Sequence, residues 1–571
     1  MQTQLLHIPK WLLRIAAAIC AAGLAWILVM YGLTGRVATV ESAPPRLIPQ
    51  TDVNPYGANF FLDQEVEAWK REKTVQMAEA AGIGWAKQSF PWEAIELKRK
   101  GRFIDADGHS TWQKYDDIVD LLNKHNIQVI ARLDRPPAWS RQDNQLPQRP
   151  PDNLDDYGDF VYAFVNHFKG RIRYIQIWNE PNIFPEWGNQ PVDPEAYTAM
   201  LKIAYTRAKQ ADPNIVVLSA PLAMTVDNSP TRRNMSDLDY LERMYRAGAK
   251  DAFDILSANA FGMDEPPSAP PDPAKLNFQR VLLQRQIMEK YGDSSKAVWF
   301  NEYGWNASPA DFPKEDLIWK RVDEAQQAQY ALDGITMARE NWPWAGVFNL
   351  WYFRQVGNKT PQQSDYYFRM VDVDFTPRQL YTQVKEAAAG LRLAHAGYYQ
   401  ETSTPIISSP GWQIVLAPSA SGGSYIDSDK PGASVTFQFE GESIDLVTYR
   451  GPETGRCLVT IDDQGIPGLP VDDQGRTYVE LYQRTSQWQT REPIASNLGR
   501  GTHALKLGVS EGSTPGAPGP RCNIDALVVG GPAPSIPTSL TALLALGLLG
   551  SSALLVYQRR HPPLGPARPR R

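Results

Sequence analysis

Two glutamates, each preceded by an asparagine at the end of an apolar run, are the residues of this chain best suited to chemistry. One run leads into Trp-Asn-Glu-Pro at residues 178–181, where the proline stops further strand pairing. The other leads into Asn-Glu-Tyr-Gly at residues 301–304. A carboxylate at the end of a buried strand is costly unless chemistry needs it. If Glu180 and Glu302 share a cleft, one could protonate a leaving oxygen while the other attacks or activates water, as in glycoside hydrolysis.

The elements around these glutamates alternate between strand and helix from residue 53 to residue 398. Expected strands are 54–61, 83–90, 127–133, 172–177, 215–221, 253–261, 297–302 and 346–353. Expected helices are 63–81, 115–125, 155–168, 194–210, 238–247, 276–291, 324–339 and 379–394. Eight repeats predict an α/β fold, a (β/α)8 TIM barrel. A doubly wound open sheet is the alternative, but no Gly-rich phosphate loop follows the first strand.

In such a barrel the two glutamates converge at the mouth. Glu180 ends the fourth strand and Glu302 ends the seventh, and barrel active sites lie at the carboxyl ends of the strands. Carboxylates about 5 Å apart would retain the anomeric configuration, whereas a wider gap would admit water and invert it.

The motifs at residues 178–181 and 301–304, on strands four and seven, closely resemble those of the retaining glycoside hydrolases of clan A, most nearly family 39. The resemblance spans residues 50 to 395. It implies that Glu180 is the general acid/base and Glu302 the nucleophile. It also implies a poly- or oligosaccharide substrate and no cofactor.

Six further residues are substrate-binding candidates. By resemblance, Asn179 bonds the sugar 2-hydroxyl and Trp351, at the end of strand eight, forms the aromatic floor of the −1 subsite. Trp139, after strand three, could line the cleft, or either tryptophan could belong to the core.

Three positions depart from the clan pattern. Lys87 stands near the place where the clan often has arginine, and it lacks the planar fork of that residue. It is interpreted either as a sugar contact or as an ion-pair partner of one glutamate. Asn259 and Phe261 stand where the clan often has His-x-Tyr, so Asn259 is a ligand contact or a polar cap, and Tyr303 is the candidate to replace the missing phenol.

Residues 399–530 lose helical periodicity and gain short alternating runs at 434–439, 444–449, 457–461 and 504–509, which predicts a β-sandwich. Cys457 and Cys522 are expected either to pair, outside the cytoplasm, or to remain buried thiols. The sandwich resembles accessory modules of bacterial glycosidases. Its rings at Tyr449, Tyr482 and Trp488 could bind a polysaccharide, or the sandwich could be a spacer.

Both ends of the chain predict membrane helices. Residues 15–33 carry no charge and follow a basic cytoplasmic segment, 1–14, although a cleaved signal peptide is the alternative. Residues 538–557 precede an arginine-rich tail, 558–571, which predicts a stop-transfer helix. The stretches 34–52 and 531–537 are interpreted as a tether and a linker. This arrangement predicts a cell-membrane protein with the catalytic domain outside the cytoplasm.

Composition excludes several classes of function. The net charge of −5 argues against a nucleic-acid partner. Seven scattered histidines, without HExxH or CxxC spacing, predict no metal site. Two alternatives to hydrolysis remain at this stage: a glycan-binding or envelope-organising protein with an inactive barrel, and a transglycosylase that uses the same two glutamates.

Overall fold

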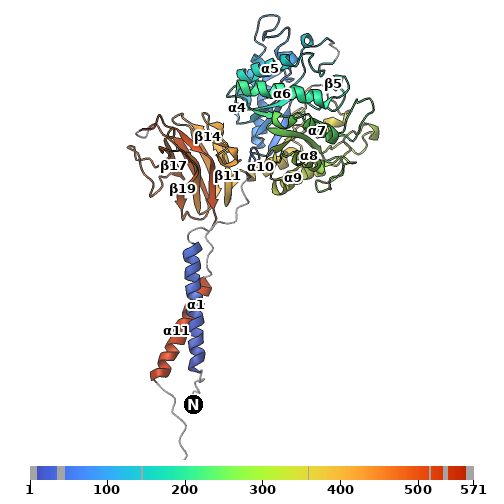
Figure 1. Ribbon diagram of the computed structural model, residues 1–571. Helices are drawn as coiled ribbons and strands as arrows, with labels where there is room; N and C mark the ends of the chain where they lie inside the picture. The colour runs from blue at the N-terminus through green and yellow to red at the C-terminus, as the bar shows by residue number, and fades with distance from the viewer. Residues whose placement is uncertain are drawn as a thin grey trace, which may run out of the picture.

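The computed structural model describes residues 9–34, 46–142, 146–357, 359–512, 516–531 and 538–560, without the side chains of residues 10, 24–34, 538–545 and 558. A barrel, a β-rich unit beside it and a pair of terminal helices make up this part of the chain (Figure 1). The termini of the expected organisation, residues 1–8 and 561–571, and most of the expected linker lie outside the described residues.

A closed barrel of eight parallel strands confirms the predicted α/β fold. The strands in barrel order are β1 (Tyr56–Phe60), β2 (Trp85–Ser89), β3 (Gln128–Leu133), β4 (Tyr174–Ile177), β6 (Val216–Leu218), β7 (Ile255–Phe261), β8 (Ala297–Gly304) and β9 (Ala345–Leu350). The outer helices are α2 (Ala68–Ala80), α4 (Gln113–Lys124), α5 (Leu154–His167), α6 (Pro194–Ala211), α7 (Asp237–Arg246), α8 (Val281–Lys290), α9 (Glu324–Asn341) and α10 (Gln379–Gly390). The short elements α3 (Trp92–Ile95) and β5 (Glu186–Asn189) lie in the loops after β2 and β4.

Capping residues fix where several of these helices begin. Asn153 accepts a hydrogen bond from the backbone of Asp155 at the start of α5, and Asp193 accepts one from Ala196 at the start of α6. Asp323 and Gln326 form a reciprocal capping box at the start of α9. Each cap satisfies amide donors that the helix itself leaves free, so the loops that reach the barrel mouth end at defined points.

The barrel interior has two layers of different chemistry. The lower layer is apolar and consists of Val53, Trp85, Ile130, Tyr174, Val216, Leu218, Ile255, Ala297, Trp299 and Val347. The same strands continue upward into buried polar residues, among them Asn59, Lys87, Gln176, Asn259 and Asn349. Because side chains alternate along a strand, a residue two positions beyond an inward-facing one also faces inward, one layer higher.

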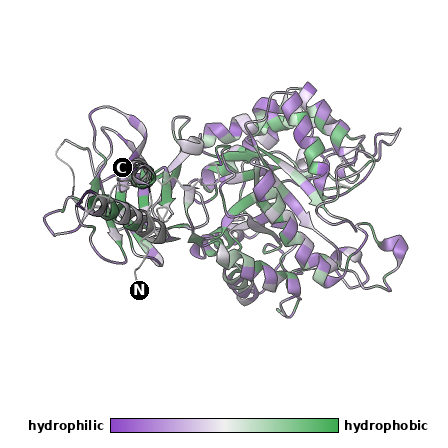
Figure 2. Ribbon diagram, turned by 90° about the horizontal axis from the view of Figure 1, so that it is seen from below, coloured by the Kyte–Doolittle hydropathy of each residue, from purple (hydrophilic) through white to green (hydrophobic). Residues whose placement is uncertain are grey.

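The β-rich unit consists of three sheets of antiparallel and short parallel strands. The sheet orders are β10-β15-β20-β17-β18 with β12 paired to β15, β11-β22-β16-β19, and β13-β14-β21. The strands are β10 (Leu393–Ala394), β11 (Gly397–Gln400), β12 (Ile406–Ser408), β13 (Gln413–Leu416), β14 (Ser424–Ser428), β15 (Ser434–Glu440), β16 (Ser443–Arg450), β17 (Arg456–Ile461), β18 (Tyr478–Glu480), β19 (Gln487–Ser496), β20 (Thr502–Val509), β21 (Cys522–Ile524) and β22 (Ala526–Gly530). Figure 2 shows hydrophilic segments along the loops around the barrel and around this unit.

The expected disulfide between Cys457 and Cys522 is present and joins β17 to β21 inside the unit's core. The expected glycan-binding role of Tyr449 is not supported, because its side chain is buried and stacks on Trp488 with the ring centroids 4.2 Å apart. Asp52, ahead of the barrel, accepts hydrogen bonds from Gln400 and Ser403 and thereby ties the barrel to the unit.

The terminal helices are α1 (Lys10–Thr34) and α11 (Thr538–Arg560), which lie side by side (Figure 1). They coincide with the two expected membrane spans, residues 15–33 and 538–557, but parts of both spans lie outside the residues whose side chains are described. Among the described residues, no helix combines the length and apolar character needed to cross a bilayer.

Candidate active site

A β-bulge on β8 turns two consecutive side chains into the barrel. The register pairs Ala258 with Phe300 but Asn259 with Glu302, so Asn301 is the extra residue. Asn301 donates to the side chain of Asn259 at 3.3 Å, and Glu302 faces Lys87. A regular strand would point only one of the two inward, so the bulge is what lets the Asn-Glu pair act together.

Glu302 is buried and paired with a cation. Its carboxylate accepts from the Lys87 ammonium at 3.0 Å, and the Lys87 nitrogen also lies 6.0 Å from the ring centroid of Trp351. Burial lowers the pKa of Lys87, and the Glu302 charge opposes that shift. The structure therefore brings together three predicted residues, Glu302, Lys87 and Trp351, and it assigns Lys87 to the ion pair.

Glu180 stands on a turn with unusual backbone geometry. Trp178 and Glu180 both have positive φ angles, 75° and 39°, which few residues other than glycine adopt. The backbone amides of Trp178 and Glu180 donate to the carbonyls of Leu133 and Pro221, at 3.1 and 3.0 Å. Such conformations persist only when surrounding contacts hold them, and they cluster at functional sites.

The surroundings of Glu180 favour its protonated form. Burial and the nearby charge of Glu302 raise the pKa of Glu180 to about 8, with Glu186 adding to the effect. Asn259 donates to the Glu180 carboxylate at 2.6 Å and opposes the shift. Asn259 thus contacts Glu180 and sits in register with Glu302, so the two glutamates meet at one place in the barrel mouth.

Asn179, which immediately precedes Glu180, is buried, but its side-chain oxygen is not hydrogen-bonded to the described residues. Buried acceptors are normally paired, so this oxygen is suited to receive a donor from a bound molecule.

Two predicted site residues lie elsewhere. The expectation that Tyr303 replaces the missing phenol is wrong: its side chain faces the outer helices, and its hydroxyl donates to the Ala331 carbonyl of α9 at 2.6 Å. The alternation beyond the bulge sends Tyr303 outward when Glu302 faces inward. Trp139 donates from its indole nitrogen to the Glu96 carbonyl at 2.8 Å and packs edge-on against Trp92, which makes it a packing residue of the β3 loop.

A charged group beside the glutamates was not predicted. Arg132 at the end of β3 pairs with Asp134 at 3.0 Å, and its charge acts on Glu302. Burial raises the pKa of Glu186 on β5 to about 7. Ile130, Arg132 and Asp134 alternate along and just after β3, and this pattern could have identified Arg132 and Asp134 as facing the barrel interior. Glu186 lies in an irregular loop where no periodicity points to it.

One cluster has the composition of a metal site. Among the described residues, Asp105, Asp107 and His109 place possible ligand atoms within 4.8 Å of one another. The Asp105 carboxylate already accepts from the backbone amides of Asp107 and His109. The cluster lies between α3 and α4, its Asp107 and His109 are exposed, and the backbone hydrogen bonds to Asp105 account for its turn.

Comparison with known proteins gives structural likeness only. No protein-family model matches the chain, and no curated protein matches it. A family 39 glycoside hydrolase from Bacteroides cellulosilyticus WH2 is similar at 17% identity, with a TM-score of 0.44 and coverage of 82% of this chain and 83% of that one. A monomeric β-xylosidase from Caulobacter crescentus CB15 is similar at 13% identity, with a TM-score of 0.44 and coverage of 82% and 98%. The GH39 enzyme from Xanthomonas axonopodis pv. citri is similar at 14% identity, with a TM-score of 0.45 and coverage of 81% and 96%.

Proposed function

We propose that this protein is a retaining glycoside hydrolase that cleaves a poly- or oligosaccharide with Glu180 and Glu302. The observation that carries the proposal is that two neighbouring carboxyls have environments that favour opposite protonation states. Burial and the charge of Glu302 hold Glu180 in its acid form, whereas Glu302 is ion-paired to Lys87. Glycoside hydrolysis needs this division, with one carboxyl that carries a proton and one that is ionised.

In the first step a Glu302 oxygen attacks the anomeric carbon while the bond from that carbon to the leaving oxygen breaks. Glu180 gives its proton to the leaving oxygen, so that the leaving group departs as an alcohol. The product of this step is a glycosyl ester on Glu302 and an ionised Glu180.

The second step uses the change in charge that the first produces. Esterification removes the negative charge of Glu302, which is one of the causes that raise the pKa of Glu180. The pKa of Glu180 therefore falls, and its carboxylate is suited to take a proton from water. The resulting hydroxyl group bonds to the anomeric carbon, the ester bond breaks, and the sugar leaves with its original configuration.

Asn179 and Trp351 are proposed to hold the sugar ring. The unpartnered oxygen of Asn179 would accept from a sugar hydroxyl, and the partly exposed ring of Trp351 would pack against the sugar's C–H face. Both residues are anchored close to the reacting pair, because Asn179 immediately precedes Glu180 and Trp351 lies near Lys87.

The deciding experiment is digestion of a glycan panel by the wild-type chain and by Glu302→Gln. Turnover by the wild type alone, with the first product keeping its anomeric configuration by NMR, is the expected result. A 2-fluoro sugar should label Glu302. Equal turnover by both proteins, or an inverted product, would overturn the assignment.

We also propose that the barrel works in an oxidising compartment. The buried Cys457–Cys522 disulfide supports this, since such bonds persist outside the cytoplasm.

A further inference from the structure

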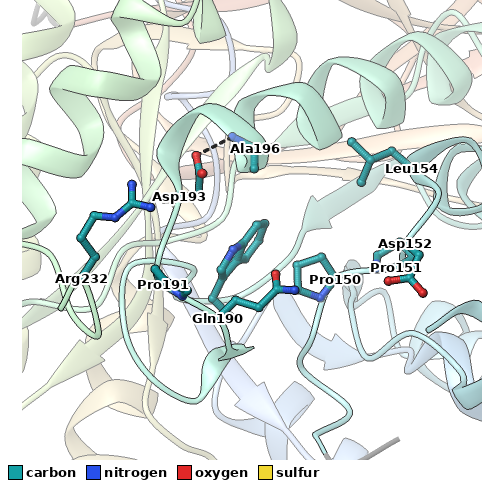
Figure 3. Close-up of a pocket in the computed structure, with 10 residues that line it drawn as sticks. Pro150, Pro151, Asp152, Leu154, Gln190, Pro191, Asp193, Ala196 and Arg232 are labelled. Atoms are coloured by element: carbon teal, nitrogen blue, oxygen red, sulfur yellow. Dashed lines mark hydrogen bonds between the residues drawn. The ribbon is translucent and has the colours of Figure 1, made fainter. Parts of the chain in front are cut away.

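A cavity of about 440 Å³ opens beside the N-terminus of α6, and none of its lining residues belongs to the catalytic group described above. It is lined by Pro150, Asp152, Gln190, Asp193 and Arg232 together with Trp187 and neighbouring residues (Figure 3). This volume is within the range of sites that bind small molecules. We propose that this cavity is a second carbohydrate site, which binds the leaving-group end of the glycan; the inference rests on the proposed hydrolase function.

The cavity lies on the same face of the barrel as the two glutamates. Its walls come from three segments: the one between β3 and α5, the one between β4 and α6, and the one between β6 and α7. All three follow the carboxyl end of a barrel strand, which is the end that carries Glu180 and Glu302. The backbone amide of Val192 donates to the carbonyl of Arg232 at 2.8 Å and joins two of the walls.

One wall of the cavity is connected to the turn that carries Glu180. Trp187 packs edge-on against Trp178, with ring centroids 5.9 Å apart, and Trp178 also donates from its indole nitrogen to the Glu186 carbonyl. Glu180 follows Trp178 by two residues. A general acid must face the oxygen that leaves, so the part of the glycan beyond that oxygen lies on the Glu180 side of the cleft. The cavity is therefore placed for the leaving-group portion rather than for the sugar that Glu302 attacks.

The lining suits an uncharged sugar unit. The buried residues Pro150 and Trp187 and the exposed Pro191 give the lining its apolar part. The exposed side chains of Gln190 and Arg232 offer donors for hydroxyl groups. Asp193 offsets the Arg232 charge, and Asp152 is paired with Arg149 at 2.8 Å, so the cavity has no excess of positive charge for an anion. Asp193 also caps α6 by accepting from Ala196, which occupies the helix end where an anion would otherwise bind.

The test compares two substrates of the sugar that the glycan panel identifies: its p-nitrophenyl glycoside and an oligosaccharide extended on the leaving-group side. Ala196→Trp places an indole in the cavity from an exposed helix position, and Arg232→Ala removes a donor. Ala80→Trp is the matched control, because Ala80 is exposed near the end of α2, the end that leads into the opposite face of the barrel. Thermal unfolding checks that each variant folds.

We expect kcat/KM for the extended oligosaccharide to fall about tenfold in Ala196→Trp and less in Arg232→Ala, mainly through KM. Turnover of the aryl glycoside, and both activities of Ala80→Trp, should stay at the wild-type value. If Ala196→Trp does not fold, Arg232→Ala decides. If the ratio of the two activities is unchanged, whether both stay at the wild-type value or both fall equally, the second site would be overturned while the hydrolase proposal stays intact. No turnover of any glycan by the wild type would instead remove the proposed function itself.

Discussion

The lower and upper layers of the barrel interior are built on the same strands, but the lower layer is apolar and the upper layer is polar. In the lower layer Trp85, Tyr174 and Trp299 pack ring against ring, with the Trp85 and Trp299 centroids 4.8 Å apart. In the upper layer the corresponding positions are polar, and Lys87, Asn259 and Glu302 are bonded to one another or to Glu180. One layer removes apolar surface from water, and the other buries charges at a cost that is repaid only in part by pairing.

This difference indicates that the lower layer contributes mainly to stability and the upper layer mainly to chemistry. Two residues along β2 separate Trp85 from Lys87, and a similar step along β8 separates Trp299 from the bulge that carries Glu302. A substitution in the lower layer should therefore act on folding, and one in the upper layer should act on turnover.

The largest effect is expected for Glu302→Gln. Removal of the nucleophile should lower kcat by about 10³-fold or more, because an amide cannot form the glycosyl ester of the first step. The amide oxygen still accepts from Lys87, but the buried ammonium loses its paired charge, so the free energy of unfolding should fall by about 1–3 kcal/mol while the protein stays folded. Turnover of an aryl glycoside and chemical denaturation measure the two quantities. A loss of stability that matches the loss of turnover would erase the distinction between the layers.

Trp299→Ala tests the lower layer. The indole is fully buried and donates to the Gln50 carbonyl at 2.8 Å. Its loss leaves a cavity in the barrel, so the free energy of unfolding should fall by about 3–5 kcal/mol. Denaturant titration measures this fall. The kcat of the molecules that remain folded, determined by active-site titration, should stay within a few-fold of wild type; a large fall in kcat would mean that the layers are coupled.

The sequence predicted the barrel and much of its upper layer because both depend on local patterns. Apolar runs alternating with helical periodicity predicted all eight barrel strands, and their ends located Glu180 and Glu302. Lys87 was interpreted either as a sugar contact or as an ion-pair partner, because its position near the end of β2 suits both roles, and the structure shows the ion pair.

The errors come from features that local patterns do not contain. Tyr303 was misplaced because the bulge at Asn301 adds a residue and reverses the alternation that follows. Glu186 was missed because it lies in a loop whose fold is set by irregular contacts, such as the hydrogen bond from the Trp178 indole to its carbonyl, rather than by a periodic pattern. The cavity beside α6 was missed for the same reason, since three loops build it together.

Glu180→Gln should have the next largest effect. The general acid supplies about 10²- to 10⁴-fold, so a sugar leaving group should be released slowly, while a nitrophenolate leaving group needs less help. In the wild type, activity should fall as pH rises through about 8, because Glu180 then loses its proton. That basic limb should be absent from the pH profile of the variant. A limb that persists near pH 8 would assign it to another group.

Asn259→Ala should shift the pH profile with a smaller change in rate. Asn259 donates to the charged form of Glu180 and so lowers its pKa; without that bond the pKa of Glu180 should rise. The basic limb of kcat should therefore move to higher pH. Ser257→Ala, two residues earlier on the same strand, is the control and should leave the limb in place. A shift to lower pH would contradict the direction of the effect.

The smallest effect is expected for Tyr303→Phe, which tests whether Tyr303 has a role apart from that of its neighbour Glu302. The hydroxyl donates to the Ala331 carbonyl on the outer side of β8, so its loss should lower the free energy of unfolding by about 1 kcal/mol. The ring remains and keeps its edge-on contacts with Phe278 and Phe348, which preserves the position of Glu302 on the strand. Values of kcat and KM on the aryl glycoside should therefore equal those of the wild type. A tenfold fall in kcat at unchanged stability would place the phenol beside the nucleophile after all, and would mean that the bulge does not turn Tyr303 outward.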